Sequence, residues 1–308
     1  MPCNSRFIFF GTPEFAAVIL EKLIKNGFVP AAVVCNPDRP VGRKKIVAPP
    51  PVKTKIMNYE ARIREQIKIF QPENLPAIHD ALFMLQPDFF IVAAYAKIIP
   101  KEMLKIPRLG AIGVHPSLLP KYRGPSPIQA ALLGGEEKSG VTLFLMDEKA
   151  DHGPILARRE LNYEARIANY ESLMRKLAEL GADLLIEALP DIENKIKNAR
   201  PQDESQATYT KKFKTEDGFV DFNDLKKALR GENGAAESVW RKIRALNPEP
   251  GVFTVAEKNG QEKRIKLLSA ALENGRLKPT AVQPEGKKPL VDLAAIRQYI
   301  NQYININA

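Results

Sequence analysis

The first two-thirds of the chain alternate short apolar runs with amphipathic segments, and this alternation limits the fold more than any other feature. Five runs are as short and as continuously apolar as buried strands, at residues 7–10, 31–35, 89–94, 111–114 and 140–146. Helical patterns separate or follow them at residues 15–26, 74–85, 101–106 and 170–195, the last interrupted near Pro190. Strands that alternate with helices predict βαβ units, so we expect an α/β fold with a mainly parallel sheet.

A different pattern begins after a polar stretch at residues 198–206. A helix is predicted at residues 235–245. Short alternating runs bounded by Gly, Asn and Pro follow at residues 252–255, 264–268 and 281–282. This spacing is typical of a small β-barrel. We therefore predict two domains, residues 1–205 and residues 206–308, joined by a linker in the segment 196–206.

The composition is that of a soluble globular protein, with 44% hydrophobic and 27% charged residues in a chain of 308. The most apolar run, Phe89–Ala96, is far shorter than the ~20 residues that span a bilayer, and the residues after Arg6 do not resemble a signal peptide. The only two cysteines, Cys3 and Cys35, show no motif spacing, which favours a reducing compartment. We therefore expect a cytoplasmic protein with no membrane partner.

The net charge of +10 is weighted toward the end of the chain, because residues 206–308 carry 18 Lys and Arg against 12 Asp and Glu. Such an excess favours a polyanionic partner, since neutralising phosphates releases counterions. A second basic segment contains Arg43, Lys44 and Lys45 and leads into three prolines at 49–51. Proline removes backbone donors, so the segment cannot be helix or strand throughout, and we predict a surface loop of some length there.

A strand that stops at a histidine marks the candidate active site. The run 111–114 ends at His115, and a loop of Pro, Ser and Leu residues follows at 116–120. Ligands of open α/β sheets bind beyond the carboxyl ends of the strands, which is where His115 is expected. Gly11-Thr12-Pro13 lacks the spaced glycines of a dinucleotide loop, so neither NAD nor ATP is predicted, and no metal site is expected.

The loop Ser-Leu-Leu-Pro-Lys-Tyr-Arg-Gly at residues 117–124 resembles the active-site loop of the folate-dependent formyltransferases. Further matching segments lie along the chain at Phe10–Ala16, Pro37–Pro40, Pro51–Lys53, Gly140–Thr142, Met146–Asp147 and Asp151–Gly153. In the last third, three segments are similar to the branch that acts on tRNA, the methionyl-tRNA formyltransferases: Arg244–Pro248, Pro250–Thr254 and Gln283–Lys288.

The resemblance implies a Rossmann-like formyltransferase domain followed by an OB-like β-barrel. It also implies a reaction, in which a formyl group passes from 10-formyltetrahydrofolate, the donor substrate, to the α-amino group of methionyl initiator tRNA for translation initiation. The expected partners are therefore the folate donor and the initiator methionyl-tRNA, and we expect the protein to act as a monomer.

The resemblance also implies roles for individual residues. His115 and Asp151 match the family's catalytic pair, although Asp151 by itself, in Asp-His-Gly, is typical of a turn, and His152 is given no role. Folate contacts are implied for Ser117, Leu118, Leu119 and Pro120, with Ile91–Tyr95 as pocket wall. Contacts to tRNA phosphates are expected from Arg43, Lys44, Lys45, Lys121, Arg123, Arg241, Lys242, Lys287 and Lys288.

Gly113 departs from the family pattern, which has an asparagine two residues before the histidine. An amide there is thought to hold the formyl oxygen, and the loss of one such donor typically costs about 10²–10³ in rate. We expect the enzyme to be active, and we expect Gly113→Asn to keep the fold and change the turnover number. Two alternatives remain open: a formyltransferase that acts on an amino-sugar nucleotide, and a binding protein whose catalysis is impaired by Gly113.

Overall fold

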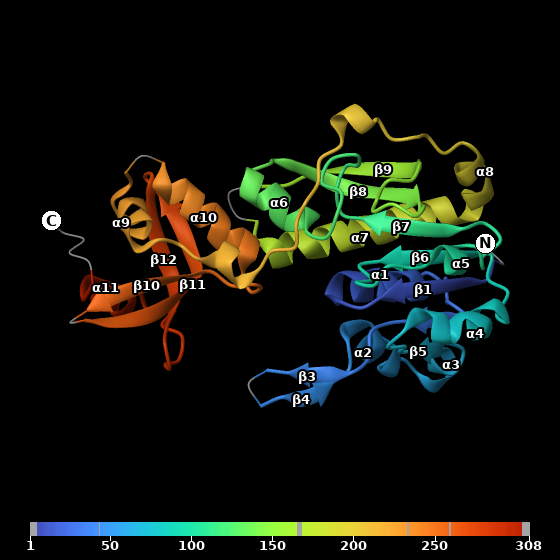
Figure 1. Ribbon diagram of the computed structural model, residues 1–308, viewed down its shortest axis with the longest axis horizontal. Coiled ribbons are helices and arrows are strands. Elements are labelled where there is room, and N and C mark those ends of the chain that lie inside the picture. Colours follow the sequence, from blue (N-terminus) through green and yellow to red (C-terminus); the bar gives the residue numbers. More distant parts are fainter. Residues whose placement is uncertain (1–4, 43, 165–167, 233, 259, 304–308) are drawn as a thin grey trace. The chain divides into compact units, whose positions relative to one another are not determined.

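The computed structural model describes residues 5–42, 44–164, 168–232, 234–258 and 260–303, so that Cys3 and Arg43 lie outside the described residues (Figure 1). The chain forms two compact units. The first comprises Met1–Gly124, Lys138–Asn162 and Met174–Tyr209, and the second comprises Pro125–Glu137, Tyr163–Leu173 and Thr210–Ala308.

A seven-stranded sheet forms the centre of the first unit. Its strands are β1 (Phe7–Gly11), β2 (Ala32–Val34), β5 (Lys68–Phe70), β6 (Phe89–Ala93), β7 (Ala111–His115), β8 (Lys138–Leu145) and β9 (Ile155–Asn162). They lie in the order β5-β2-β1-β6-β7-β8-β9. The five strands from β5 to β7 are parallel, and β8 and β9 add antiparallel pairs. The predicted mainly parallel α/β sheet is therefore confirmed.

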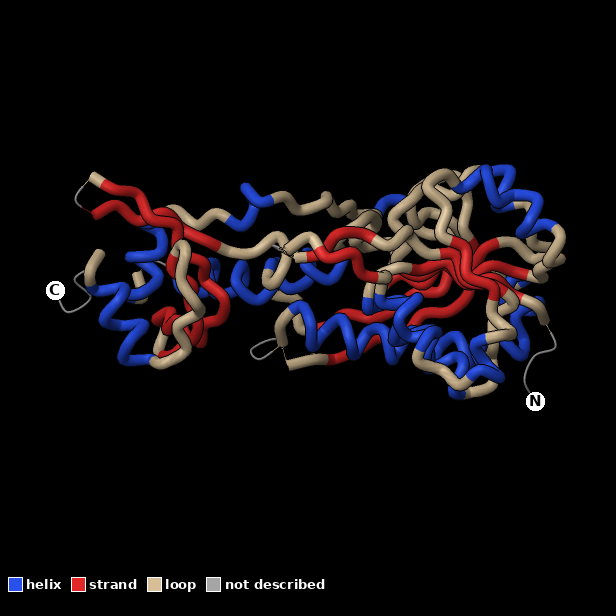
Figure 2. The backbone as a smooth tube through the Cα atoms, turned by 90° about the horizontal axis from the view of Figure 1, so that it is seen from below, coloured by secondary structure: helices blue, strands red, loops and turns tan. Residues whose placement is uncertain are grey.

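Helices lie on both sides of this sheet (Figure 2). The helical elements of the first unit are α1 (Glu14–Lys25), α2 (Pro51–Met57), α3 (Ala61–Arg64), η1 (Leu75–Ile78), α4 (His79–Phe83), α5 (Lys101–Leu104), η2 (Leu189–Asp191), α8 (Ile192–Lys197), η3 (Glu204–Gln206) and most of α7 (Tyr170–Ala188). The long helix predicted at 170–195 is thus interrupted at Pro190, as expected, because proline lacks the donor that continues a helix.

Each face of the sheet is buried by side chains from one layer of helices. On one face, Leu75, Leu82 and Met103 from the η1, α4 and α5 segments pack in one cluster with strand residues that include Phe10 and Phe90. On the other face, α7 approaches closely at Gly181, where a Cβ would lie 3.1 Å from Val114 Cγ1. These contacts fix β6 and β7, and with them the ends of the strands where ligands of such sheets bind.

The basic segment, which we predicted as a surface loop, is an exposed hairpin with two short strands. Strands β3 (Arg39–Val41) and β4 (Ile46–Ala48) pair antiparallel, with Pro40 opposite Val47. Proline is tolerated in a two-stranded ribbon because both strands are edges. At the base of the hairpin, Lys53 Nζ lies 2.9 Å from Asp38 Oδ2, which connects it to α2.

The second unit contains a small antiparallel β-sheet, as predicted. Its elements are α6 (Pro127–Gly134), η4 (Thr215–Gly218), α9 (Phe222–Arg230), α10 (Ala235–Leu246), β10 (Phe253–Lys258), β11 (Gln261–Glu273), β12 (Arg276–Pro284) and α11 (Leu293–Asn301). The described strands form an open sheet in the order β10-β11-β12 rather than the closed barrel that we expected. No helix in the described ranges has both the length and the apolar character to cross a membrane.

Residues 200–209, most of which we predicted as linker, belong to the first unit and form backbone hydrogen bonds with its other segments. Arg200 forms a β-bridge with Ile155, and Tyr209 forms one with Arg123. The domain boundary near residue 205 stays a prediction, but the segment beside it is held by backbone hydrogen bonds instead of running free.

Candidate active site

The sheet topology places His115 beside a reversal of strand order. From β1 the chain proceeds to β2 on one side and later to β6 on the other, so the order reverses between β1 and β6. His115 ends β7, the neighbour of β6, and is 6% exposed. Open α/β sheets bind their ligands at the carboxyl ends of strands near such a reversal, so His115 lies where a site is expected.

Asp151 comes from the turn between β8 and β9, 36 residues further along the chain, and meets His115. Its Oδ2 lies 3.6 Å from His115 Nδ1. The other ring nitrogen, Nε2, lies 2.9 Å from the carbonyl oxygen of Tyr122, to which it donates. A doubly protonated ring would have an acceptor for each N–H, a carboxylate on one side and a carbonyl on the other.

The carboxylate of Asp151 also bonds to the loop that follows His115. Gly124 N donates to Asp151 Oδ2 at 2.7 Å. Two residues of this site, Tyr122 and Asp151, have left-handed backbones with φ of 62° and 50°. Such conformations are costly for residues with a side chain and persist only where their surroundings hold them, which is common in active sites.

Phe144 fills the space in which a side chain at position 113 would lie. The two residues are opposite one another in the β7–β8 pair. A Cβ built on Gly113 would be 2.3 Å from Phe144 Cε1, and the Phe144 ring is 2% exposed. An asparagine therefore does not fit at 113 without displacing a buried ring, so we expect the substitution to cost stability, and whether the fold stays intact remains a prediction. The glycine and the phenylalanine act as a complementary pair.

Gly113→Asn should lower the free energy of unfolding by about 1–3 kcal/mol, because it overpacks a buried position. The same substitution should cost less in a Phe144→Val background, where the ring no longer fills the space. Urea unfolding followed by circular dichroism of the four proteins of this double-mutant cycle gives the coupling energy. Equal costs in the two backgrounds would show that the ring moves aside freely.

The loop at 117–120 is packed into the protein. Ser117, Leu119 and Pro120 are buried and Leu118 is partly exposed. Thr142 Oγ1 on β8 donates to Ser117 O at 2.7 Å, and it accepts from Leu119 N at 3.1 Å. These bonds fix the loop against the sheet, directly after His115. The folate contacts implied for its side chains stay a prediction.

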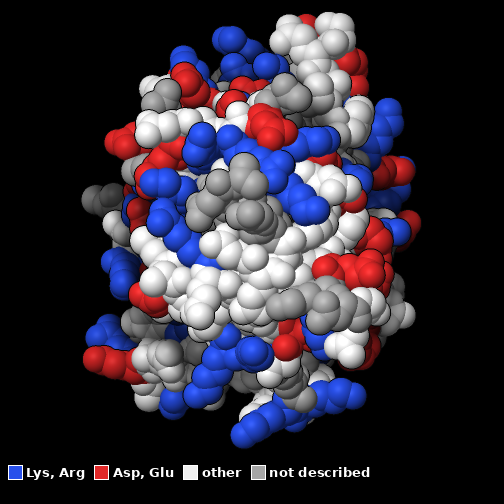
Figure 3. Space-filling view, turned by 90° about the vertical axis from the view of Figure 1, so that its left-hand side faces the viewer, with Lys and Arg blue, Asp and Glu red and all other residues white. Residues whose placement is uncertain are grey.

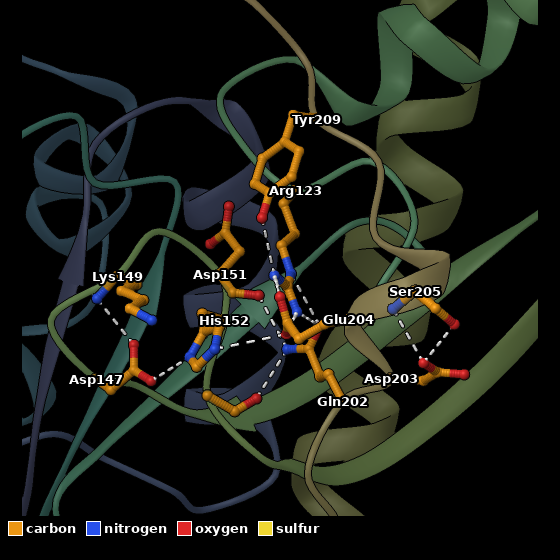
Figure 4. Close-up of polar contacts among 11 residues, drawn as sticks. Arg123, Asp147, Lys149, Asp151, His152, Gln202, Asp203, Glu204, Ser205 and Tyr209 are labelled. Carbon is orange, nitrogen blue, oxygen red and sulfur yellow. Dashed lines mark hydrogen bonds and ion pairs between the residues drawn. The ribbon is translucent and has the colours of Figure 1, made fainter.

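Arg123 is not available for phosphate, which corrects our expectation of a tRNA contact. Its side chain is 1% exposed and lies 2.6 Å from Glu204 Oε1 (Figure 4). It also donates to Gln202 Oε1 and Tyr209 Oη. Glu204 raises the pKa of Arg123 by hydrogen bonding, and Arg123 lowers that of Glu204 in the same way. A guanidinium buried among acceptors is a structural group.

Gln202 is a neighbour of the site that sequence reasoning missed, and His152, to which we gave no role, lies beside it. Gln202 Nε2 donates to the carbonyl oxygens of Asp151 and Gly153, at 2.9 and 2.8 Å. His152 Nδ1 lies 2.6 Å from Asp147 Oδ2, and its Nε2 lies 3.5 Å from Glu204 (Figure 4). A glutamine in a polar stretch gives no signal of its own, because only the tertiary fold brings residue 202 to residue 151.

Comparison with known proteins gives the class of protein. Residues 5–189 match the family described as formyl transferase, and residues 212–291 match the formyl transferase C-terminal domain. Among solved structures, HypX from Aquifex aeolicus in complex with tetrahydrofolic acid is similar, with a TM-score of 0.62 at 18% identity. The superposition covers 96% of this chain and 48% of HypX, about half of that protein. This likeness shows the fold, and the family match identifies a formyl transferase.

The curated relatives narrow the class. The methionyl-tRNA formyltransferase of Staphylococcus epidermidis is 39% identical over 274 residues, covering 88% of this chain and 81% of the relative. That of Thermotoga maritima is 43% identical over 248 residues, covering 80% of this chain and 74% of the relative. The chain belongs to the methionyl-tRNA formyltransferase family.

Proposed function

We propose that this protein transfers a formyl group from 10-formyltetrahydrofolate to the α-amino group of methionyl initiator tRNA. The observation that carries the proposal is the convergence of His115 and Asp151, with 3.6 Å between Nδ1 and Oδ2, at the carboxyl end of β7. Family membership supports the donor and the acceptor class, and it favours tRNA over an amino-sugar nucleotide.

Formyl transfer moves the formyl carbon from the folate to the amine, and one proton from the amine to the folate. A bond forms between the amine nitrogen and the formyl carbon, and the bond from that carbon to N10 of the folate breaks. The amine loses a proton and N10 gains one. We assign stabilisation of the protonated ring to Asp151, which faces Nδ1. We assign proton movement and hydrogen bonding to the developing oxyanion to His115 Nε2, which exchanges its bond to the Tyr122 carbonyl for the substrate in the reacting complex. With a phenyl ring beside Gly113 in place of an amide, His115 becomes the side chain on which the oxyanion depends.

The folate is proposed to lie along the strand ends next to His115. Two polar atoms at this edge of the sheet, Tyr95 Oη after β6 and Asn36 Oδ1 after β2, are buried without a hydrogen-bond partner in the part of the chain that the structure describes. Buried polar atoms in proteins are normally paired, so unpaired ones fit a site for a polar ligand. The burial of Ser117, Leu119 and Pro120 leaves Leu118 as the loop side chain best placed for direct contact, while the other three shape the wall.

The tRNA is proposed to contact the tip of the β3–β4 hairpin and the second unit. Lys44 and Lys45 are exposed at the tip, and Lys287 and Lys288 are exposed after β12. Figure 3 shows Lys and Arg side chains in several groups over the face that it displays. We assign a smaller part to Arg241 and Lys242, because their side chains donate to the carbonyls of Gly134 and Phe219.

Lys44→Ala with Lys45→Ala should weaken tRNA binding and flatten its salt dependence. Removing two phosphate contacts should reduce the slope of log Kd against log salt by about 1 to 2. Filter binding at several salt concentrations measures this. Lys68→Ala with Lys105→Ala is the matched control. Lys68 begins β5 and Lys105 precedes β7, so both lysines lie toward the amino ends of strands, whereas His115 lies at a carboxyl end. Equal slopes for the two double variants would contradict the role of the hairpin.

The proposed function is tested by transfer of radiolabelled formyl groups. Purified protein and 10-formyltetrahydrofolate are incubated with methionyl initiator tRNA, with methionyl elongator tRNA and with an amino-sugar nucleotide. We expect product from the initiator tRNA and far less from the other two. Product from the sugar nucleotide alone would overturn the proposal, and folate binding without any product would indicate a binding protein. We also propose that the protein is cytoplasmic and that it is a monomer; size-exclusion chromatography tests the oligomeric state.

A further inference from the structure

A segment of the chain that follows α8 crosses both loops of the candidate site. We call residues Gln202–Tyr209 the strap, residues Pro116–Gly124 the histidine loop and residues Asp147–Gly153 the aspartate loop. Figure 4 shows strap residues beside Arg123 of the histidine loop and beside Asp151 of the aspartate loop. All three segments belong to the first unit.

Gln202 uses both ends of its amide to connect the two loops. Its Nε2 donates to Asp151 O at 2.9 Å and to Gly153 O at 2.8 Å. Its Oε1 accepts from Arg123 Nε at 3.1 Å and from Arg123 Nη2 at 2.9 Å. The amide can face only this way, because carbonyl oxygens need a donor and a guanidinium needs an acceptor.

Arg123 is a rigid support for this amide. Its guanidinium is buried, and Glu204 and Tyr209 Oη hold it from other directions. A buried, planar group with several partners cannot move without breaking several hydrogen bonds. Gln202 is therefore fixed on one side and holds the aspartate loop on the other.

The backbone of Asp151 needs such support. Its φ of 50° is left-handed, a conformation that costs a residue with a side chain roughly 1–2 kcal/mol. The direction of the carboxylate follows from this backbone, because Asp151 Oδ2 reaches Gly124 N at 2.7 Å and faces His115 Nδ1 from it. If the backbone relaxed, the carboxylate would leave both partners.

Thr208 supports the histidine loop from the other end of the strap. Its Oγ1 accepts from Tyr122 N at 2.8 Å, and its backbone oxygen accepts from Arg123 N at 2.8 Å. Tyr122 is also left-handed, and its carbonyl oxygen accepts from His115 Nε2. The strap therefore bonds to the two residues, Asp151 and Tyr122, that lie against the two ring nitrogens of His115.

We propose that Gln202 is a positioning residue for the Asp151 carboxylate and that Thr208 plays the same part for the Tyr122 carbonyl, so that the strap sets the orientation of the His115 ring from both sides. The proposal rests on the proposed function, since it assigns to the strap the geometry of the pair that we place at the reacting centre. Neither residue touches substrate in this proposal.

Gln202→Glu separates positioning from structural support. The carboxylate still accepts from Arg123, so the support of the guanidinium survives, but it has no N–H to donate to the two carbonyl oxygens and repels them. We expect kcat to fall about 10- to 100-fold, as a misplacement of about 1 Å does, while KM for both substrates stays within about twofold. The amide proton of Gly124, which reports the place of Asp151 Oδ2, should exchange with solvent faster.

Gln206→Ala is the control, because Gln206 lies in the strap but its side chain donates to Asp203 Oδ2 within the strap. It should keep the wild-type kcat, whereas Gln202→Ala should not. Thr208→Val is a second test, since Thr208 is exposed and valine has the same shape without an acceptor; it should lower kcat by about tenfold.

The outcomes are distinguishable. Wild-type kcat in Gln202→Glu and Thr208→Val, with unchanged exchange of Gly124, would overturn the inference and leave the proposed function intact. A wild-type protein that forms no formyl-methionyl-tRNA would overturn the proposed function. In that case the exchange of Gly124 in Gln202→Glu still tests whether the strap holds Asp151.

Discussion

Asp151→Asn is expected to lower kcat for formyl transfer by about 10²–10⁴-fold with little change in either KM. Asparagine has the shape of aspartate and keeps an oxygen for the N–H of Gly124, which bonds to Asp151 Oδ2 at 2.7 Å. What it removes is the negative charge 3.6 Å from His115 Nδ1. The variant therefore isolates the electrostatic part of the contact, and stopped-flow or quench measurements of formyl-methionyl-tRNA give the rate of the chemical step.

Asp147→Asn is the matched control for this substitution. Asp147 lies in the same loop, but its carboxylate bonds His152 Nδ1 at 2.6 Å instead of His115. It should lose less than about tenfold in kcat. His115→Ala should lose as much as Asp151→Asn, and the double variant should lose little more, because residues that act as one unit are not additive. Additive losses, or equal losses in Asp147→Asn and Asp151→Asn, would contradict the pairing.

The elements buried on both faces were predictable from the sequence. β1 and β6 are continuous apolar runs, and β7 is one up to His115. Every residue in these three strands is buried, so their composition indicates buried strands. β9 was missed because it is an edge strand with Arg158, Arg159 and Glu160 in its middle, and its residues after the buried Leu156 alternate between partly buried and exposed. The β3–β4 hairpin was missed because its strands are short, exposed and contain a proline, which hides the usual pattern.

The candidate site was predictable only in part, because the tertiary structure brings together residues that are distant in the sequence. His115 was indicated by its place after a buried strand, but nothing local to Asp151 distinguished it from a turn residue, and only the family resemblance named it. Phe144 was missed because its relation to Gly113 depends on the register of β7 with β8, which an apolar run does not reveal. Arg123 was expected to bind phosphate because a basic residue in a loop is usually exposed, whereas the strap covers this one.

Arg123→Met should lower the free energy of unfolding of the first unit by about 2–4 kcal/mol. Methionine fills part of the volume but makes none of the hydrogen bonds that Arg123 donates to Gln202, Glu204 and Tyr209. In this variant Glu204 loses its partner, but its side chain is 57% exposed and water can solvate it. The loss of stability is therefore smaller than the loss caused by a buried charge without a partner. Urea unfolding followed by circular dichroism measures the change, since the only tryptophan, Trp240, reports the second unit.

Arg108→Met provides the matched control. Arg108 also belongs to the first unit and also bonds two carboxylates, Asp88 at 3.0 Å and Glu193 at 2.8 Å, but its side chain is 58% exposed. Exposed ion pairs contribute little, so this substitution should cost less than about 1 kcal/mol. A comparable loss in both variants would show that the burial of Arg123 does not matter to stability.

The dependence on pH separates the ion pair with Glu204 from the neutral bonds of Arg123. Hydrogen bonding to Arg123 lowers the pKa of Glu204 from its ordinary value of 4.5. A carboxyl whose pKa is lower in the folded state stabilises the fold above its unfolded pKa, and this contribution is lost as the pH falls through the folded value. The difference in the free energy of unfolding between the wild type and Arg123→Met should therefore be largest near pH 7 and smaller below about pH 4. It should not reach zero, because the bonds of Arg123 to Gln202 and Tyr209 persist. A gap that is constant down to about pH 3 would assign the whole effect to those neutral bonds.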